Sequence, residues 1–369
     1  MTDSKPHYSE LNLIAISGCF ILIIFYLYLE LNWYKSSAAF WLMQSGSFWL
    51  FAIHSVSKRI WLNRADPDAQ IYTDLGWANR LTILRGLFIA MTGGFLFQPW
   101  PEHTLMWLPG ILYAFAAILD RLDGYAARKS KRTSLMGMEL DTVFDALGLV
   151  VAPLLAAGYG QVHWSYLLFS SAYYLFQWGL YRRRQLGLPV YSLSPNILRR
   201  AWAGFQMGFI AVTLLPLFRP PVTTVAGFAF MIPVLTGFII DWLTVSGRID
   251  HKKEAIRKYF KKLETVSNNL MLPLLRIMIV SSLVSLVKLP DTMQESAMLL
   301  IAGLILSGIL ARVAALVLIG LSGFYFMKHV MDITGICLMV STIWMLLLGS
   351  GRYSLWKWDE DWVNRYDGA

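Results

Sequence analysis

The sequence predicts an all-α, polytopic membrane protein with about twelve transmembrane helices. Hydrophobic residues make up 56% of the 369-residue chain and charged residues only 15%, whereas soluble domains carry roughly 25% charged residues. The mean hydropathy is +0.51. Lysine and arginine gather in short segments between apolar stretches, so the net charge of +9 indicates positive loops at a membrane rather than a nucleic-acid-binding surface.

Apolar stretches near the length of about 20 residues that a bilayer-crossing helix needs recur along the whole chain. The predicted spans are 11–33, 37–56, 81–99, 104–127, 138–159, 163–181, 200–218, 222–247, 270–289, 296–311, 313–328 and 334–350. The two cysteines, Cys19 and Cys337, lie alone in such stretches, so the sequence predicts neither a disulfide framework nor a cysteine metal site.

Basic residues follow every second predicted span and therefore share one face of the membrane. The clusters are Lys58, Arg59 and Arg64; Arg128 to Arg132; Arg182 to Arg184 with Arg199 and Arg200; and the run from Arg248 to Lys262. The positive-inside rule places this face, and with it both termini, in the cytoplasm. We expect an integral protein of the cell (inner) membrane with its active site on the cytoplasmic side.

Composition changes divide the chain into four predicted segments. Residues 1–57 form a two-span hairpin, 58–247 a six-helix core, 248–268 a basic linker helix and 269–369 a four-helix membrane module. Apolar residues recur at helical spacing among the lysines of the linker, which indicates either a helix lying on the cytoplasmic leaflet or a solvated linker.

Four aspartates stand out inside apolar sequence. Asp120 and Asp123 lie near the end of the 104–127 span, and Asp141 and Asp145 near the start of the 138–159 span. Residues three or four apart share one face of a helix. Since a short turn joins the two spans, the helices are antiparallel neighbours, and we expect the four carboxylates to converge near the cytoplasmic end.

Converging carboxylates need a cation, because each aspartate inside a membrane costs roughly 2.5–3.5 kcal/mol on insertion scales. Oxygen-only ligands favour Mg²⁺, with Mn²⁺ or Ca²⁺ as alternatives. Gly124 and Gly137 leave space beside the backbone, Arg128 can neutralise phosphate oxygens, and one carboxylate can serve as general base toward a hydroxyl. The stretch therefore indicates phosphoryl transfer from a diphosphate ester to an alcohol. The alternative is that the acids pair with helix-end arginines or face an aqueous cavity.

The pattern D-x-x-D-G-x-x-A-R-x8-G-x3-D-x3-D, from Asp120 to Asp145, resembles the signature of the CDP-alcohol phosphotransferase family of membrane enzymes. The resemblance covers about 75–247 and implies a six-helix core. It implies that Asp120, Asp123 and Asp141 hold a divalent metal, with Asp145 as a further ligand and as the base. It also implies that a group of small and basic residues shapes the CDP site: Gly124, Ala127, Arg128 and Gly137.

Two further groups carry weaker parts of the resemblance. Asn79, Thr82 and Arg85 are similar to the start of the family's first core helix, on the nucleotide side, with a helix cap and interfacial anchors as the alternative. Arg199 and Arg200 resemble the patch that receives the phosphate of the acceptor, with positive-inside arginines as the alternative. The glycerol-phosphate type is similar to G-K-x-K-T-x-x-Q. Only its last position, Gln206, agrees here; the substituted positions are Arg199, Arg200, Trp202 and Ala203.

Residues 270–355 resemble a DoxX-like four-helix membrane module, and the alternative is a generic pair of hairpins. No cofactor is predicted for this module, because His329 and Cys337 are its only residues of those types. We interpret it as a lipid-binding or partner-binding unit.

The predicted function is the transfer of a phosphatidyl group from a CDP-activated donor, CDP-diacylglycerol, to a soluble alcohol or phospho-alcohol that enters from the cytoplasm, with release of CMP. The lipid bilayer is the expected environment, and nucleic acid is not an expected partner. Members of this family often dimerise, so a homodimer is an alternative to a monomer. Two other functions stay open: a transporter that binds ions near the membrane centre, and a catalytically inactive scaffold.

Overall fold

The computed structural model describes residues 8–130, 132–193, 197–249, 258, 261–263, 265–287, 290–356 and 358. Within these ranges the secondary structure is helical and no strand forms; one isolated backbone bridge joins Ile309 to Trp356. The predicted all-α class is confirmed.

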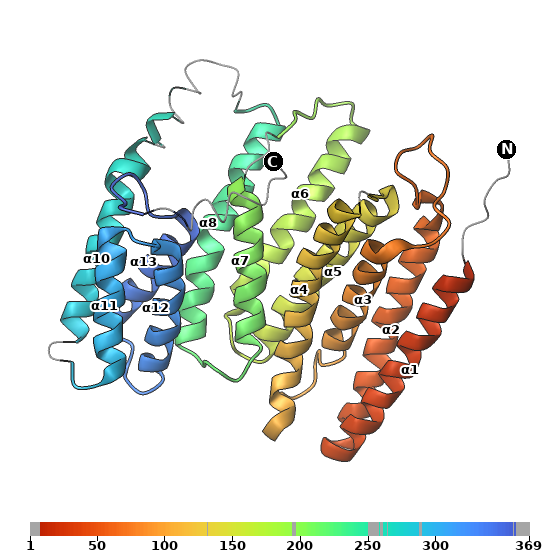
Figure 1. Cartoon of the computed structure of the whole chain (residues 1–369), viewed down its shortest axis with the longest axis horizontal. Helices are drawn as coiled ribbons and strands as arrows, with labels where there is room; N and C mark the ends of the chain where they lie inside the picture. Colours follow the sequence, from red (N-terminus) through yellow and green to blue (C-terminus); the bar gives the residue numbers. More distant parts are fainter. Residues whose placement is uncertain are drawn as a thin grey trace. The chain divides into compact units, whose positions relative to one another are not determined.

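Twelve α-helices lie in the described ranges, and each coincides with one predicted span (Figure 1). They are α1 (Tyr8–Asn32), α2 (Lys35–Arg59), α3 (Gly76–Gly93), α4 (Leu108–Lys129), α5 (Leu135–Gly158), α6 (Leu167–Gln185), α7 (Ile197–Thr213), α8 (Val222–Val245), α10 (Leu272–Leu286), α11 (Met293–Ser307), α12 (Ala311–Phe326) and α13 (Ile333–Leu348). Short turns η1 (Ile60–Leu62), η2 (His103–Trp107), η3 (Trp164–Tyr166) and η4 (Ser267–Met271) adjoin them.

The helices identify an integral membrane protein. Five helical segments are long and apolar enough to cross a bilayer: Tyr8–Asn32, His103–Lys129, Leu135–Gly158, Val222–Val245 and Lys261–Leu286. Four shorter apolar helices accompany them in the described part of the chain. The number of spans and the cytoplasmic orientation stay predictions.

The chain forms two compact units, the first being Met1–Gln161 with Met207–Leu217 and the second Val162–Gln206 with Phe218–Ala369. In the first unit α1 and α2 form a hairpin, α2 packs against α3, and α3 packs against α4 and α5. Helix α3 is thus the centre of the unit. Four of its buried side chains, Asn79, Thr82, Arg85 and Thr92, are polar, and buried polar groups require hydrogen-bond partners.

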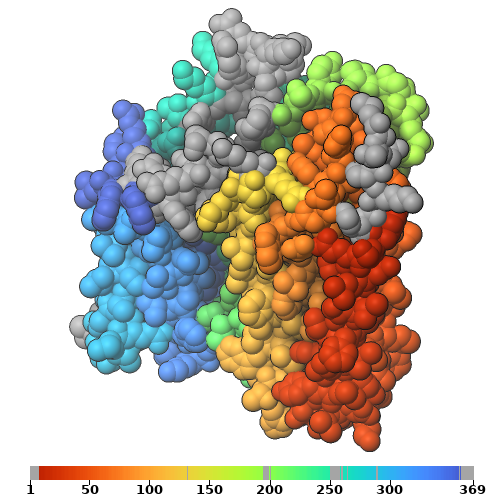
Figure 2. All heavy atoms as spheres, turned by 45° about the vertical axis from the view of Figure 1, so that its right-hand side comes forward, coloured from red at the N-terminus to blue at the C-terminus, as the bar shows by residue number. Residues whose placement is uncertain are grey.

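Tryptophan side chains join the N-terminal hairpin to α3. The indole of Trp49 on α2 donates to the carbonyl of Ala15 on α1 at 3.1 Å, and Trp41 donates to the carbonyl of Met91 on α3 at 3.0 Å. Gly18 makes room for the first contact, since a Cβ there would lie 2.3 Å from the Trp49 ring. The outer face of α1 lies at the surface of the unit (Figure 2), where its exposed isoleucine, leucine and phenylalanine side chains suit a lipid environment.

In the second unit α6 and α13 each pack against α8, and α10 to α13 pack against one another. Helix α11 begins with a capping box formed by Thr292 and Glu295, and α13 begins at Asp332, whose carboxylate accepts the Gly335 N–H. The buried Arg276 on α10 donates to the carbonyl of Tyr353 at 2.7 Å. The two caps explain where α11 and α13 begin, and the Arg276 contact joins α10 to the segment that follows α13.

The boundaries of the four predicted segments stay predictions. Most of the predicted linker helix 248–268 lies outside the described residues. The DoxX-like resemblance of 269–369 also stays a prediction.

Candidate active site

Helix α3 brings the two halves of the acidic motif to one place. The Thr82 hydroxyl donates to Asp123 of α4 at 2.9 Å, and one turn further along α3 the Arg85 guanidinium reaches Asp120. The later residue on α3, Arg85, contacts the earlier residue on α4, Asp120, so these two helices are antiparallel. Arg85 also donates to the Asp141 carboxylate of α5 at 3.0 Å. The site is therefore built from three helices.

The site lies about one-half of a helix length from the ends of its helices. Asp120 precedes the last residue of α4, Lys129, by nine residues, and Asp145 follows the first residue of α5, Leu135, by ten. At 1.5 Å per residue, Asp120 and Asp145 lie roughly 13–15 Å along the helix axis from these helix ends. The predicted convergence of the carboxylates is thus what the helices produce.

The four carboxylates differ in solvent access. The side chain of Asp123 is 8% exposed and that of Asp120 is 18% exposed, whereas those of Asp141 and Asp145 are each 50% exposed. Asp120 and Asp123 thus form the inner wall of the site. Asp141 and Asp145 line the side that solvent and a soluble reactant can reach.

Arg85 is the internal counter-charge of this cluster. Its side chain is 1% exposed, and its Nη atoms lie 3.0 Å from Asp141, 3.4 Å from Asp145 and 3.8 Å from Asp123, with the closest contact to Asp120. One guanidinium against four ionised carboxylates leaves a formal charge of about −3, which is costly in an apolar surrounding unless further cations bind.

The donor set fits a hard divalent cation. One carboxylate oxygen from each of Asp120, Asp141 and Asp145 lies within 4.8 Å of the other two. Opposite ligand oxygens are separated by about 4 Å around Mg²⁺ and about 5 Å around Ca²⁺, so small side-chain rotations suffice for one ion to reach all three. Asp123 is not in this group; it accepts the Thr82 hydroxyl instead.

The predicted nucleotide-side residues fall into two local arrangements. Arg128 is exposed at the end of α4, and its guanidinium lies over Gly124, where a Cβ would stand 3.3 Å from Nη1. Ala127 is half-buried between them and its carbonyl accepts the Arg132 N–H. The space left by Gly124 thus receives an exposed, positively charged group suited to phosphate oxygens.

Gly137 has a different neighbour. A Cβ at this position would lie 2.7 Å from Oδ1 of Asn79, so the glycine permits α3 and α5 to approach. The amide of Asn79 donates to Asn63 and to the Leu75 carbonyl, and its Oδ1 accepts the Ser134 hydroxyl. Asn79 and Gly137 therefore join helices in this structure, and their predicted role beside the nucleotide stays a prediction.

The predicted acceptor patch belongs to the second unit. Arg199 forms an ion pair with Asp241 of α8 at 2.9 Å. The side chain of Arg200 lies outside the described residues. Gln206 is buried; its amide donates to the Phe230 carbonyl at 2.8 Å and its Oε1 accepts the Tyr166 hydroxyl. Both ends of this amide thus have partners within the protein.

Two contributors to the site were not predicted. Ser134 is the N-cap of α5, where its hydroxyl accepts the Gly137 N–H at 3.0 Å, and a serine directly before an apolar helix is a recognisable sequence signal. The second is the pairing of Asp74 with Arg132. No local pattern indicates it, because 58 residues separate the partners.

Comparison with known proteins places a family domain in this chain. Residues 75–243 match the family model described as CDP-alcohol phosphatidyltransferase, which confirms the resemblance of the Asp120–Asp145 motif. Three similar curated proteins bear the name CDP-diacylglycerol–glycerol-3-phosphate 3-phosphatidyltransferase. The one from Cereibacter sphaeroides is 32% identical over 94 residues, which is 24% of this chain and 41% of that protein. The one from Pectobacterium atrosepticum is 37% identical over 62 residues, 16% of this chain and 34% of that protein.

The third, from Blochmanniella floridana, is 33% identical over 72 residues, which is 20% of this chain and 38% of that protein. The chain thus spans 34–41% of the length of these three relatives. No solved protein structure gives a significant match.

Proposed function

We propose that this chain, which carries a CDP-alcohol phosphatidyltransferase family domain over residues 75–243, transfers a phosphatidyl group from CDP-diacylglycerol to a small alcohol and releases CMP. The observation that carries this proposal is the cluster of Asp120, Asp141 and Asp145, whose oxygens lie within 4.8 Å of one another beside a buried arginine. An all-oxygen, strongly anionic cluster within about 15 Å of a helix end suits a diphosphate substrate bound through divalent ions.

The chain's own residues divide the work as follows. Asp120, Asp141 and Asp145, whose oxygens lie within 4.8 Å of one another, would hold the divalent ion, and Asp123, which accepts the Thr82 hydroxyl, would be a further ligand once its carboxylate turns toward the ion. Mg²⁺ is the first choice and Mn²⁺ the alternative. An ion bound there polarises the phosphoryl oxygens and offsets their negative charge. Arg85 fixes the carboxylates in place, and Arg128 contacts the phosphates from the end of α4.

Asp145 is the proposed general base. Its side chain is 50% exposed and can therefore meet a soluble alcohol. The acceptor oxygen forms a bond to the phosphorus that carries diacylglycerol, and Asp145 takes the hydroxyl proton. The bond from that phosphorus to the CMP oxygen breaks, and CMP leaves with the electron pair.

The acceptor is proposed to be a small alcohol or phospho-alcohol. The names of the three relatives make glycerol 3-phosphate the first acceptor to test. Arg199, which the sequence comparison with the family suggested for an acceptor phosphate, pairs with Asp241 within the second unit, and this pairing offsets part of its charge. An assay must therefore include uncharged alcohols as well as phosphorylated ones.

The test uses the full chain purified in detergent, with CDP-diacylglycerol in mixed micelles, Mg²⁺ and a panel of alcohols. We expect CMP release with at least one alcohol, loss of release in EDTA and recovery with added Mg²⁺. Asp145→Asn should lower the rate by about 10²–10⁴-fold, the usual contribution of a general base.

The matched control is Glu139→Gln, which removes another carboxylate of α5. The Glu139 carboxylate pairs with Arg59 at 2.9 Å and not with Arg85. This variant should release CMP at a rate close to that of the unmodified chain. Failure to release CMP with every alcohol in the panel would overturn the proposal in favour of a transporter or an inactive scaffold.

A further inference from the structure

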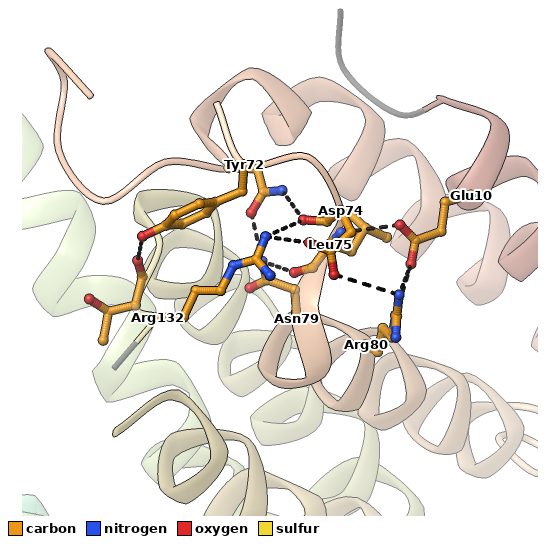
Figure 3. A network of polar contacts seen from close by, with 9 residues as sticks. Glu10, Tyr72, Asp74, Leu75, Asn79, Arg80 and Arg132 are labelled. Carbon is orange, nitrogen blue, oxygen red and sulfur yellow. Dashed lines mark hydrogen bonds and ion pairs between the residues drawn. The ribbon is translucent and has the colours of Figure 1, made fainter. Parts of the chain in front are cut away.

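A network of charged and polar side chains lies outside the acidic cluster, at the ends of the helices that build it (Figure 3). It joins three parts of the first unit: Glu10 at the start of α1, the segment Tyr72 to Leu75 before α3, and Arg132 in the connection between α4 and α5. None of these residues belongs to the acidic motif, and Glu10 and Tyr72 precede the segment that matches the family model.

Arg132 is held on several sides. Its guanidinium pairs with the Asp74 carboxylate, donates to the Asp74 carbonyl at 3.1 Å and lies 4.5 Å from the centre of the Tyr72 ring. The Tyr72 hydroxyl in turn donates to the carbonyl of Thr133 at 3.2 Å. The segment before α3 and the α4–α5 connection therefore bind each other in both directions.

The N-terminal hairpin supports the same segment. The Glu10 carboxylate accepts the N–H of Leu75 at 3.1 Å and the Nε–H of Arg80 at 2.8 Å. Arg80 also lies 3.8 Å from the Asp74 carboxylate. Figure 3 shows Glu10 and Arg132 approaching the start of α3 from opposite sides. The first residues of α3 are thus held between α1 and the α4–α5 connection.

The position of these contacts gives them a consequence for the acidic site. Asp74 lies two residues before the start of α3, the helix that carries Arg85, and Arg132 lies three residues before the start of α5. The carboxylates of Asp141 and Asp145 sit on α5 and contact Arg85. A helix behaves as a rigid rod over these distances of about 10–15 Å, so a shift at its start reaches the site.

We propose that the Asp74–Arg132 pair, supported by Glu10, is a clamp that sets the register of α3 against α5 and thereby the spacing of the carboxylates around Arg85. Asp74, Arg132 and Glu10 are positioning residues. On this view the N-terminal hairpin takes part in forming the active site as well as in anchoring the chain. The proposal rests on the proposed function for its substrates, and its first readout is independent of them.

The clamp residues are partly exposed, with side-chain exposures of 31% for Arg132 and 40% for Asp74. Exposed ion pairs contribute little to folding stability. A purely structural role therefore predicts small changes in both metal binding and unfolding temperature when the pair is removed. A positioning role predicts weaker metal binding with little change in unfolding temperature. These two expectations can be separated by experiment.

The experiment measures Mn²⁺ binding to the full chain by the electron paramagnetic resonance signal of free Mn²⁺, without lipid substrate. We expect Arg132→Gln and Asp74→Asn each to weaken Mn²⁺ binding roughly fivefold, within the roughly 2- to 100-fold range typical of coupled neighbours. The double variant should bind Mn²⁺ about as weakly as the more affected single variant, because the Asp74–Arg132 ion pair is lost in all three. Glu10→Gln should weaken binding in the same direction.

The matched control is Arg64→Gln. Arg64 precedes the Tyr72–Leu75 segment in the connection between α2 and α3, and its side chain donates to the Pro67 carbonyl within that connection. It should bind Mn²⁺ as the unmodified chain does. CMP release then provides a second readout, in which the clamp variants should need about fivefold more Mn²⁺ for half of their maximal rate.

Two outcomes separate this proposal from the proposed function. If the unmodified chain binds Mn²⁺ but releases no CMP, the proposed function fails, and the clamp is judged by Mn²⁺ binding alone. If Arg132→Gln and Asp74→Asn bind Mn²⁺ like the Arg64→Gln control, or if the double variant is weakened by the product of the two single effects, the clamp is overturned.

Discussion

Arg85→Met gives the most direct test of how the acidic site is held together. The substitution keeps an apolar stem of similar length but removes the guanidinium that contacts all four aspartates. Removing one partner of a buried ion pair typically costs about 3–5 kcal/mol, because the remaining charge is left without a partner. Asp141 and Asp145 are half exposed and can be hydrated, so we expect a loss near 3 kcal/mol in the absence of divalent ions.

That loss should depend on the divalent ion. The formal charge of the cluster changes from about −3 to about −4, so the variant attracts a cation more strongly. A ligand at 100 times its dissociation constant stabilises the folded state by about 2.7 kcal/mol, which is close to the expected loss. Mg²⁺ should therefore restore most of the stability of the variant and should stabilise the unmodified chain less.

The assay is thermal unfolding in detergent with EDTA or with saturating Mg²⁺. A domain of 150–250 residues shifts by about 2–4 °C per kcal/mol, so Arg85→Met should unfold roughly 6–12 °C lower in EDTA. Arg85→Lys keeps the positive charge, so its unfolding temperature in EDTA should lie between that of Arg85→Met and that of the unmodified chain. Arg59→Gln is the control, since the partly exposed Arg59–Glu139 pair is worth about 1 kcal/mol or less. An Arg85→Met variant that unfolds at the normal temperature in EDTA, or gains no more from Mg²⁺ than the unmodified chain, would refute the counter-charge role.

Two further predictions concern the helix starts. Gly137→Ala should destabilise the chain by about 1–3 kcal/mol in denaturation measurements, because its Cβ would lie 2.7 Å from Asn79 Oδ1. The same substitution should become stabilising in an Asn79→Ala background, and a stabilising effect in both backgrounds would contradict the close approach of α3 and α5. The hydrogen bond from Arg132 holds the pKa of the Asp74 carboxyl below its usual range. A depressed carboxyl contributes stability above its unfolded pKa of about 3.9 and loses it as the pH falls through the folded value. The difference in unfolding temperature between the unmodified chain and Asp74→Asn should therefore be constant from about pH 5 to 7 and should narrow progressively as the pH falls below about 4; a difference that does not narrow at all on acidification would count against the pairing.

The helices and the acidic cluster could be predicted because their signals are local. Apolar stretches of span length mark each helix, and the three- and four-residue spacings place Asp120 with Asp123, and Asp141 with Asp145, on shared faces. The predicted ends of the helices were less accurate than the predicted number and order of the helices. The span predicted at 81–99 is α3 at Gly76–Gly93, because the polar first turns of the helix do not count as apolar sequence and because the chain turns at Gly93 and Gly94.

The place of Arg85 could not be predicted from local pattern. The sequence indicated a nucleotide-side residue or an interfacial anchor, and either description concerns one helix alone. Its contacts with Asp120 and Asp141 depend on the register of α3 against two other helices, which is a long-range property of the fold. A charge argument could have found it, since an arginine within an apolar span and four nearby aspartates each need a partner. Gly137 shows the same limit, because the group that fills its space, Asn79, is distant in sequence.

The register of the three helices also explains why the spacing inside the acidic motif is fixed. The described residues of the connection between α4 and α5 are anchored at both ends: the Ser130 N–H donates to the Ala126 carbonyl, the Arg132 N–H to the Ala127 carbonyl, and the Ser134 hydroxyl caps α5. One additional residue would move α5 by about 1.5 Å along its axis and turn it by about 100° unless the connection absorbed it. Each of those contacts would have to break for that to happen. The nine residues that lie between Ala127 and Gly137 therefore follow from how the connection is anchored. The carboxylates of α5 meet Arg85 because the α4–α5 connection and the start of α3 are held to the same clamp.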